Sequence, residues 1–301
     1  MDDMLSESRG AVTEYPAVWL AGAGCSGCSV SLLNAVSPDI RNVLFDPVLP
    51  GKHVNLRFHP IIMAGQGEPA MKVLLDTRVE NPKGYLLLVE GAVPTAEEGL
   101  YCTIGDLSGK HMTMQDTLVE MAGDAMAVVC VGTCSSFGGI SASAPNPSGS
   151  RSVSEVLEEN GIETPLINVP GCPPHPDWVV GTIAMVLLNG LPGPDDLDPA
   201  RRPRAFYGKL IHDNCPRRAY FDAGQFARHT GDPGCLYELG CKGPMTYADC
   251  PTRLWNNGLN WCVGAGAPCI GCVEPTFPDK LQPMYHKLND DRLSRFKLKT
   301  R

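Results

Sequence analysis

Residues 17–28 read Ala-Val-Trp-Leu-Ala-Gly-Ala-Gly-Cys-Ser-Gly-Cys, an apolar run that ends in glycines and two cysteines. The run 17–21 predicts a buried strand, and the glycines after it predict a tight turn. Similar strands are predicted at 42–45, 85–89, 126–131 and 166–169, with helices at 29–36, 68–77, 113–121, 153–159 and 177–188. Strands that alternate with helices are typical of an α/β fold, in which a doubly wound parallel sheet is covered on both faces.

The second half of the chain has a different composition. Residues 191–204 contain four prolines and no apolar periodicity, which predicts a linker or an irregular crossing. Residues 206–278 also lack periodicity but are rich in glycine, proline and cysteine. We therefore predict two domains, residues 1–190 and 205–301, and expect bound metal to supply part of the folding free energy of the second domain.

Charge and cysteine content exclude several classes of protein. The net charge of −8 argues against a nucleic-acid partner, and no apolar run approaches the roughly 20 residues of a membrane span. The acidic start of the chain has no export signal, so we expect a cytoplasmic protein, or a periplasmic one if the sequence is a processed form. Thirteen cysteines, an odd number, in a long chain without a signal favour metal ligation over disulfides.

Four cysteines follow predicted strands. They are Cys25, Cys28, Cys134 and Cys172. Ligands bind outside the carboxyl ends of parallel strands, so four thiolates meeting there suit zinc or an iron-sulfur cluster. The alternatives are a redox Cys-x-x-Cys pair or buried structural thiols. The glycines around Cys25 lack the Lys-Ser/Thr ending of a phosphate loop. Cys102 and Cys130 have no partner at ligand spacing, and we interpret them as structural thiols.

The second half of the chain holds two further sets of potential ligands. One contains His212, Cys215, Cys235 and Cys241, and the other contains Cys250, Cys262, Cys269 and Cys272. Three thiolates with an imidazole, or four thiolates, hold either zinc or an iron-sulfur cluster. The spacing alone leaves both possibilities open.

A series of motifs resembles the small subunits of nickel-iron hydrogenases. The first is Trp-Leu-Ala-Gly-Ala-Gly-Cys-Ser-Gly-Cys-Ser-Val-Ser-Leu-Leu-Asn-Ala-Val at 19–36, and the others lie at 89–94, 131–134, 169–178, 212–216, 239–244, 247–250 and 269–275. The motifs keep the order of the family and cover nearly the whole chain from Trp19 to Pro278. The resemblance implies a flavodoxin-like first domain and an irregular iron-sulfur cluster-binding second domain.

The resemblance also implies three iron-sulfur clusters and their ligands. Cys25, Cys28, Cys134 and Cys172 match the ligands of the proximal 4Fe-4S cluster. His212, Cys215, Cys235 and Cys241 match those of the distal 4Fe-4S cluster, and Cys250, Cys269 and Cys272 match those of the medial cluster. Many family members have proline where this chain has Cys262, and hold a medial 3Fe-4S cluster. A fourth thiolate implies a medial 4Fe-4S cluster, as in the nickel-iron-selenium branch; the alternative is a free thiol beside a 3Fe-4S cluster.

The implied function is electron transfer within a heterodimeric hydrogenase. The chain would relay electrons between the nickel-iron centre of an obligate large subunit, where H2 and protons interconvert, and a redox protein such as a cytochrome or ferredoxin at the distal cluster. It would hold no catalytic residue of its own. The alternatives are a cluster subunit of a respiratory NADH dehydrogenase type of complex, which needs one cluster only, and a zinc-stabilised binding module.

Overall fold

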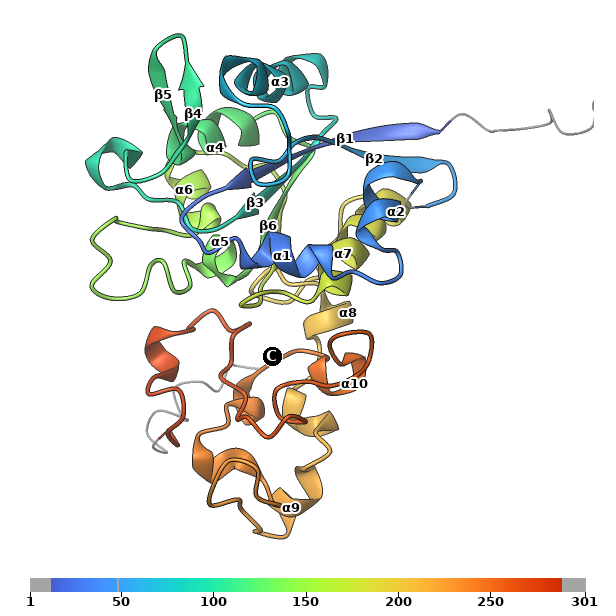
Figure 1. Cartoon of the computed structure of the whole chain (residues 1–301), viewed down its shortest axis with the longest axis vertical. Helices are drawn as coiled ribbons and strands as arrows, with labels where there is room; N and C mark the ends of the chain where they lie inside the picture. Colours follow the sequence, from blue (N-terminus) through green and yellow to red (C-terminus); the bar gives the residue numbers. More distant parts are fainter. Residues whose placement is uncertain (1–11, 48, 289–301) are drawn as a thin grey trace, which may run out of the picture.

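A five-stranded parallel sheet forms the upper part of the molecule (Figure 1). The computed structural model describes residues 12–47 and 49–288; the ends of the two predicted domains, 1–11 and 289–301, lie outside the described residues. The strands are β1 (Thr13–Ala21), β2 (Lys52–Phe58), β3 (Leu86–Glu90), β6 (Ala127–Val131) and β7 (Leu166–Val169). Their order, β2-β1-β3-β6-β7, is that of flavodoxin-like doubly wound sheets. The α/β fold class is therefore confirmed.

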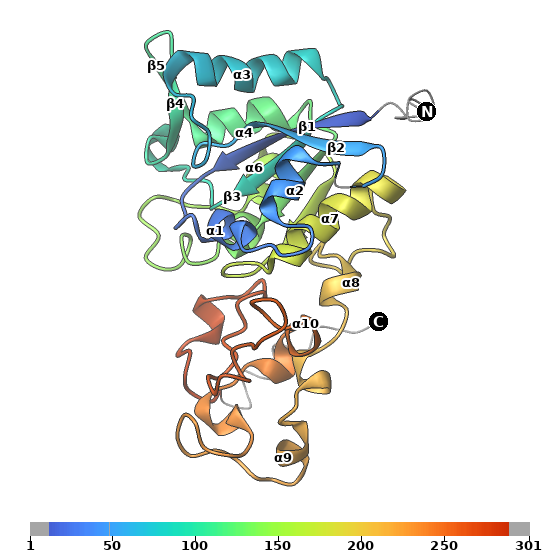
Figure 2. The same ribbon diagram turned by 45° about the vertical axis from the view of Figure 1, so that its right-hand side comes forward.

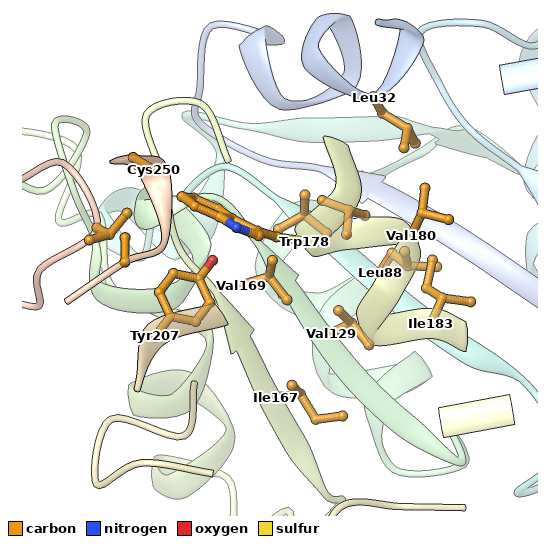
Figure 3. Packing of buried hydrophobic residues seen from close by; sticks show 14 of the residues in the cluster. Leu32, Leu88, Val129, Ile167, Val169, Trp178, Val180, Ile183, Tyr207 and Cys250 are labelled. Carbon is orange, nitrogen blue, oxygen red and sulfur yellow. The ribbon is translucent and has the colours of Figure 1, made fainter. Parts of the chain in front are cut away.

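Seven helices connect the strands or follow them. They are α1 (Gly27–Leu33), α2 (Ile40–Phe45), α3 (Gly67–Glu80), α4 (Met114–Ala122), α5 (Thr133–Phe137), α6 (Val153–Glu159) and α7 (Pro176–Asn189). Alternate strand residues point to opposite faces of the sheet. Val18 and Leu87 belong to a core shared with α3, α4 and α6. Trp19 and Leu88 belong to a core shared with α1, α2 and α7, part of which is drawn in Figure 3.

One predicted strand is wrong. Residues 42–45 lie in α2, because the carboxylate of Asp39 accepts a hydrogen bond from the backbone of Asn42 and the Asn42 side chain accepts one from the backbone of Asp39. This capping box starts a helix. The second strand of the sheet is instead β2 at its edge, where polar residues interrupt the apolar pattern and only Val54 and Phe58 are fully buried.

A short segment outside the main sheet follows β3. It consists of the 3-10 helix η1 (Ala96–Gly99) and an antiparallel hairpin of β4 (Thr103–Leu107) and β5 (Lys110–Thr113). The hairpin packs beside α3. None of these three elements is predicted from the sequence.

Residues 204–288 lie below the sheet (Figures 1 and 2) and form no element longer than five residues. The elements are α8 (Arg204–Tyr207), η2 (Ile211–Asn214), α9 (Arg218–Asp222), η3 (Leu236–Leu239), η4 (Gly243–Met245), α10 (Cys250–Arg253) and η5 (Asp279–Leu281). Their buried side chains, such as Tyr207, Ile211 and Trp261, belong to the same core as α7. The division near residues 190–205 stays a prediction. Among the described residues, no helix is long and apolar enough to cross a membrane.

Candidate metal sites

The four strand-end cysteines lie on one edge of the sheet. Cys25 and Cys28 follow β1, Cys134 lies in α5 directly after β6, and Cys172 follows β7. The chain order of the strands reverses between β1 and β3, which makes this edge the topological switch point where doubly wound sheets bind ligands. All thirteen cysteines lie in the described part of the chain and are free thiols.

Electrostatic coupling shows that these four thiols are neighbours. Burial raises the pKa of Cys28, and Glu90 and the thiols of Cys134, Cys172 and Cys25 raise it further. Burial likewise raises the pKa of Cys172 to about 11, with added contributions from Cys134 and Cys25. A metal that binds the thiolates has to displace these protons, so metal binding would release protons from the set.

Glycines leave space around the thiols. Gly132 has a φ of +97°, and a Cβ on it would lie 2.4 Å from Sγ of Cys28. A Cβ on Gly139 would lie 3.0 Å from Sγ of Cys134. Side chains at either position would fill the space beside the sulfurs. This cradle and its thiol donors fit an iron-sulfur cluster.

Glu90, a residue to which the sequence analysis gives no role, holds the first cysteine loop in place. Its carboxylate is 3% exposed and accepts hydrogen bonds from the backbone N–H groups of Cys28 (3.0 Å) and Ser29 (3.3 Å). It also accepts hydrogen bonds from Trp19 Nε1 (3.2 Å) and from the Ser29 hydroxyl. The available signal is a charged residue at the end of the apolar run of β3.

The Ser29 hydroxyl is oriented in turn by a buried histidine. The Ile61 N–H donates to Nδ1 of His59 (3.3 Å), so the neutral ring carries its proton on Nε2, which lies 3.3 Å from the Ser29 hydroxyl. Burial lowers the pKa of His59 to about 4, so the ring is neutral near pH 7. His59 also stacks on Trp19 with ring centroids 4.9 Å apart.

The set that contains Cys250 and Cys262 lines one cavity. Cys250, Cys262, Cys269 and Cys272 surround a space of about 580 Å³ together with Cys172 and Trp261. A hydrogen bond with Cys262 raises the pKa of Cys269, and burial raises it further. Cys262 therefore contacts Cys269 and faces the same space as Cys250 and Cys272, which is much larger than one metal ion.

The histidine set also lines a single, smaller pocket. His212, Cys215, Cys235 and Cys241 all face it. Nε2 of His212 is buried without a hydrogen-bond partner, and burial lowers the pKa of the ring. A neutral imidazole with an unpartnered nitrogen is suited to ligate a metal. The donor set of this pocket fits a cluster with one nitrogen ligand.

Backbone N–H groups donate hydrogen bonds to several of these sulfurs. In four cases the donor lies two residues after the cysteine: Arg217 to Cys215, Tyr237 to Cys235, Gly243 to Cys241 and Gly271 to Cys269. Two more of these hydrogen bonds join different sets. The Cys172 N–H donates to Cys272, and the Cys269 N–H donates to Cys241. These two hydrogen bonds thus connect the strand-end cysteines to the set that contains Cys250, and that set to the set that contains His212.

The described residues form no site for a single metal ion, and two thiols lie outside the three sets. Within residues 12–47 and 49–288, no three His, Cys, Asp or Glu side chains approach one another closely enough to bind a single metal ion. Cys130 is fully buried inside β6, and burial raises its pKa. Burial also raises the pKa of Cys102, which lies after η1. The structure brings neither of these thiols into any of the three sets.

Two family models match successive parts of the chain. The model for the 20 kDa subunit of NADH ubiquinone oxidoreductase matches residues 25–186. The model for the C-terminal part of NiFe/NiFeSe hydrogenase small subunits matches residues 207–285. Most of the sheet therefore matches the NADH ubiquinone oxidoreductase subunit class, and most of the region below the sheet matches hydrogenase small subunits.

Relatives match nearly the whole chain. The small subunit of the periplasmic [NiFeSe] hydrogenase of Desulfomicrobium baculatum is 48% identical over 279 residues, which cover 90% of this chain and 86% of that protein. The small subunit of the periplasmic [NiFe] hydrogenase of Solidesulfovibrio fructosivorans is 42% identical over 90% of this chain and 81% of its own length.

Solved structures agree with these relatives. A structure of the D. baculatum [NiFeSe] hydrogenase superposes with a TM-score of 0.85 at 47% identity, covering 92% of this chain and all of that one. The recombinant [NiFeSe] hydrogenase of Desulfovibrio vulgaris Hildenborough gives 0.86 at 44% identity with the same coverage. The chain belongs to the small subunits of nickel-iron hydrogenases. Its enzyme class is hydrogenase, and the active site lies on the partner subunit.

Proposed function

We propose that this chain relays electrons through three iron-sulfur clusters between the nickel-iron centre of a large subunit and an external redox partner. The proximal cluster would be held by Cys25, Cys28, Cys134 and Cys172. The medial cluster would be held by Cys250, Cys262, Cys269 and Cys272, and the distal cluster by His212, Cys215, Cys235 and Cys241. When bound, the clusters supply one-electron chemistry, while H2 and protons interconvert on the large subunit.

The observation that carries this proposal is the serial connection of the three sets. The N–H of Cys172 donates to the sulfur of Cys272, and the N–H of Cys269 donates to the sulfur of Cys241. Each hydrogen bond joins a ligand backbone of one set to a ligand sulfur of the next. Such close succession supports stepwise electron transfer from the sheet edge to the histidine pocket.

The backbone of the chain would favour the reduced form of the medial and distal sites. Hydrogen bonds to cluster sulfurs are among the features that set reduction potentials. The N–H groups of Arg217, Tyr237, Gly243 and Gly271 point at ligand sulfurs and compensate negative charge there. His212 removes one negative thiolate from the distal site, which also favours the reduced form.

Cys262 favours a medial 4Fe-4S cluster over a 3Fe-4S cluster. Its thiol lines the same cavity as the other three and forms a hydrogen bond with Cys269. The chain is also 48% identical to a [NiFeSe] hydrogenase small subunit, which supports assignment to that branch. Whether the partner's active site carries selenium is a question for metal analysis of the heterodimer.

We expect the large subunit to cover the edge of the sheet that carries the proximal thiols. Cys25 is exposed in the isolated chain. An obligate interface of this kind buries about 2,000 Å² or more. At the other end, the redox partner would be a cytochrome or ferredoxin that docks near His212.

The cellular location stays a prediction with two alternatives. The two alternatives are the cytoplasm and the periplasm. Relatives named periplasmic support the second alternative. Fractionation of cells with an antibody against this chain distinguishes the two.

Metal analysis of the purified heterodimer tests the proposal. We expect about a dozen irons for three four-iron clusters, plus the active-site iron, and broad visible absorption from sulfur-to-iron charge transfer. Nickel and selenium are counted in the same sample. A colourless, zinc-loaded protein would support the zinc-stabilised module instead. Iron for a single cluster would support the NADH dehydrogenase type, whose family model matches residues 25–186.

A further inference from the structure

Arg202 is a buried cation in the stretch that the sequence predicts to be a linker. Its side chain is only 2% exposed. Nε donates to the Asp198 carboxylate at 2.7 Å, and Nη1 donates to the Glu274 carboxylate at 3.2 Å and to the Val273 carbonyl at 3.0 Å. A guanidinium desolvated to this extent requires such partners. The stretch is therefore anchored to the second part of the molecule.

The partners of Arg202 belong to the loops that carry the medial thiols. Val273 and Glu274 directly follow Cys272. The same Oε1 of Glu274 accepts a hydrogen bond from the Tyr247 N–H at 2.7 Å, three residues before Cys250. One carboxylate thus joins the loops of Cys272 and Cys250, and Arg202 holds that carboxylate.

Tyr207 fills the space between Arg202 and the thiols. The guanidinium carbon of Arg202 lies 5.5 Å from the centroid of the Tyr207 ring, and the Tyr207 hydroxyl donates to the Pro170 carbonyl at 2.8 Å. Burial raises the pKa of Tyr207, and the thiols of Cys250 and Cys272 contribute to this rise because they are close to the ring. Figure 3 shows Tyr207 and Cys250 beside Trp178.

We propose that Arg202 is a positioning residue of the medial site that also raises its reduction potential. It fixes the two ligand loops through Glu274 and compensates the negative charge of that buried carboxylate, which lies two residues after Cys272. Reduction adds negative charge to a cluster, and a buried cation nearby favours that step. The inference rests on the proposed function, since it requires a cluster at the medial thiols.

The first test replaces Arg202 in the complete heterodimer. The medial potential is measured by a redox titration followed by EPR, in which the medial signal is the one that changes in Cys262→Pro. We expect Arg202→Met to shift this potential to more negative values and Arg202→Lys to restore most of it. The matched control is Arg201→Met, since Arg201 is 49% exposed and pairs only loosely with Glu158 at 3.4 Å. We expect no shift in the control.

The second test should shift the medial reduction potential in the opposite direction. Asp198→Asn removes a negative charge beside Arg202 but leaves its amide oxygen to accept the Ala200 and Arg202 N–H groups that Asp198 accepts at 2.9 Å. We expect a shift to more positive values, and this variant decides the question if Arg202→Met does not assemble. Potentials that match the Arg201→Met control in both variants, or shifts of the same sign, overturn the inference.

Iron and sulfide analysis of the wild-type heterodimer separates the two proposals. Three complete clusters with unmoved medial potentials overturn the role of Arg202 alone. A wild-type heterodimer without iron at the medial thiols overturns the proposed function, and the role of Arg202 with it.

Discussion

Among single residues, Glu90 has the densest set of partners around the proximal thiols. It ends β3, and its buried carboxylate accepts hydrogen bonds from Trp19, Ser29 and the backbone of Cys28. The sheet thereby fixes the start of α1, where the first two cysteines lie. The path of this loop depends on an interaction between residues about 60 positions apart in the sequence.

We expect Glu90→Ala to destabilise the protein by about 2 to 4 kcal/mol, because buried N–H groups lose their acceptor. Glu90→Gln keeps one carbonyl oxygen for the backbone of Cys28 and Ser29, and should cost about 1 kcal/mol. The thermal unfolding midpoint of the anaerobic heterodimer measures both. Glu80→Ala, at an exposed glutamate that pairs weakly with Arg57, is the control. Equal midpoints for Glu90→Ala and the control would contradict this role.

On the proposed function, Cys262 decides the type of the medial cluster. We expect Cys262→Pro to leave three thiols in the medial cavity and to convert the site to a 3Fe-4S cluster. EPR of the oxidised variant detects the new 3Fe signal, and Cys102→Ser, at a thiol outside the three sets, serves as the control. The absence of a 3Fe signal in an assembled Cys262→Pro protein would falsify the assignment.

At the scale of elements, the turns after the strands shape the proximal site. The turn between β6 and α5 passes through Gly132 with positive φ, close to the sulfur of Cys28. Glycine is required there both for the backbone conformation and for the space. The contact of this turn with Cys28 depends on the sheet, which brings β6 and the end of β1 to the same edge.

We expect Gly132→Ala to lower the iron content by about four atoms per heterodimer, the content of one cubane cluster. The added Cβ would meet Sγ of Cys28 at 2.4 Å. Gly161→Ala is a matched control, because Gly161 also has positive φ (+65°) but nothing within 4 Å of its Cβ. This control should lose about 1 kcal/mol of stability and no iron. Equal iron contents in the two variants would rule out the steric explanation.

The helices and strands are predicted correctly where the apolar or capping pattern is strong and lies within a few consecutive residues. β7 and α6 have the predicted bounds, because the sequence itself shows the short apolar run of β7 and the Ser-x-x-Glu pattern of Ser152 and Glu155. Residues 42–45 fail because their apolar content resembles a strand while the cap at Asp39 starts a helix. The edge strand β2 is missed because polar residues interrupt its apolar pattern, so that only Val54 and Phe58 are buried.

At the scale of the whole molecule, residues 204–288 depend on contacts with the sheet and on the proposed clusters. Their helices are far shorter than helices that are stable alone. One apolar core extends from the sheet through Trp178 and Tyr207 to Trp261. This shared core stabilises this part of the chain, and on the proposed function metal binding would add to its stability.

We expect removal of iron to loosen residues 204–288 while the sheet persists. Hydrogen exchange before and after anaerobic treatment with an iron chelator measures this. Amides near Cys235 and Cys269 should exchange faster after iron loss, whereas those of β3 and β6 should stay protected, because their strands are fully buried. Unchanged protection near Cys235 and Cys269 would mean that apolar packing alone holds this part of the chain.

The sequence by itself determined the α/β class and the family, and it predicted three sets of metal-type residues. These properties follow from local periodicity and from motifs that are contiguous in the chain. Only the tertiary structure decided that the Cys172 N–H donates to Cys272, that Glu90 holds Cys28 and that Arg202 is buried against the carbonyl of Val273. The physical reason is that such contacts join residues far apart in sequence, and the parallel sheet and its shared core bring them together.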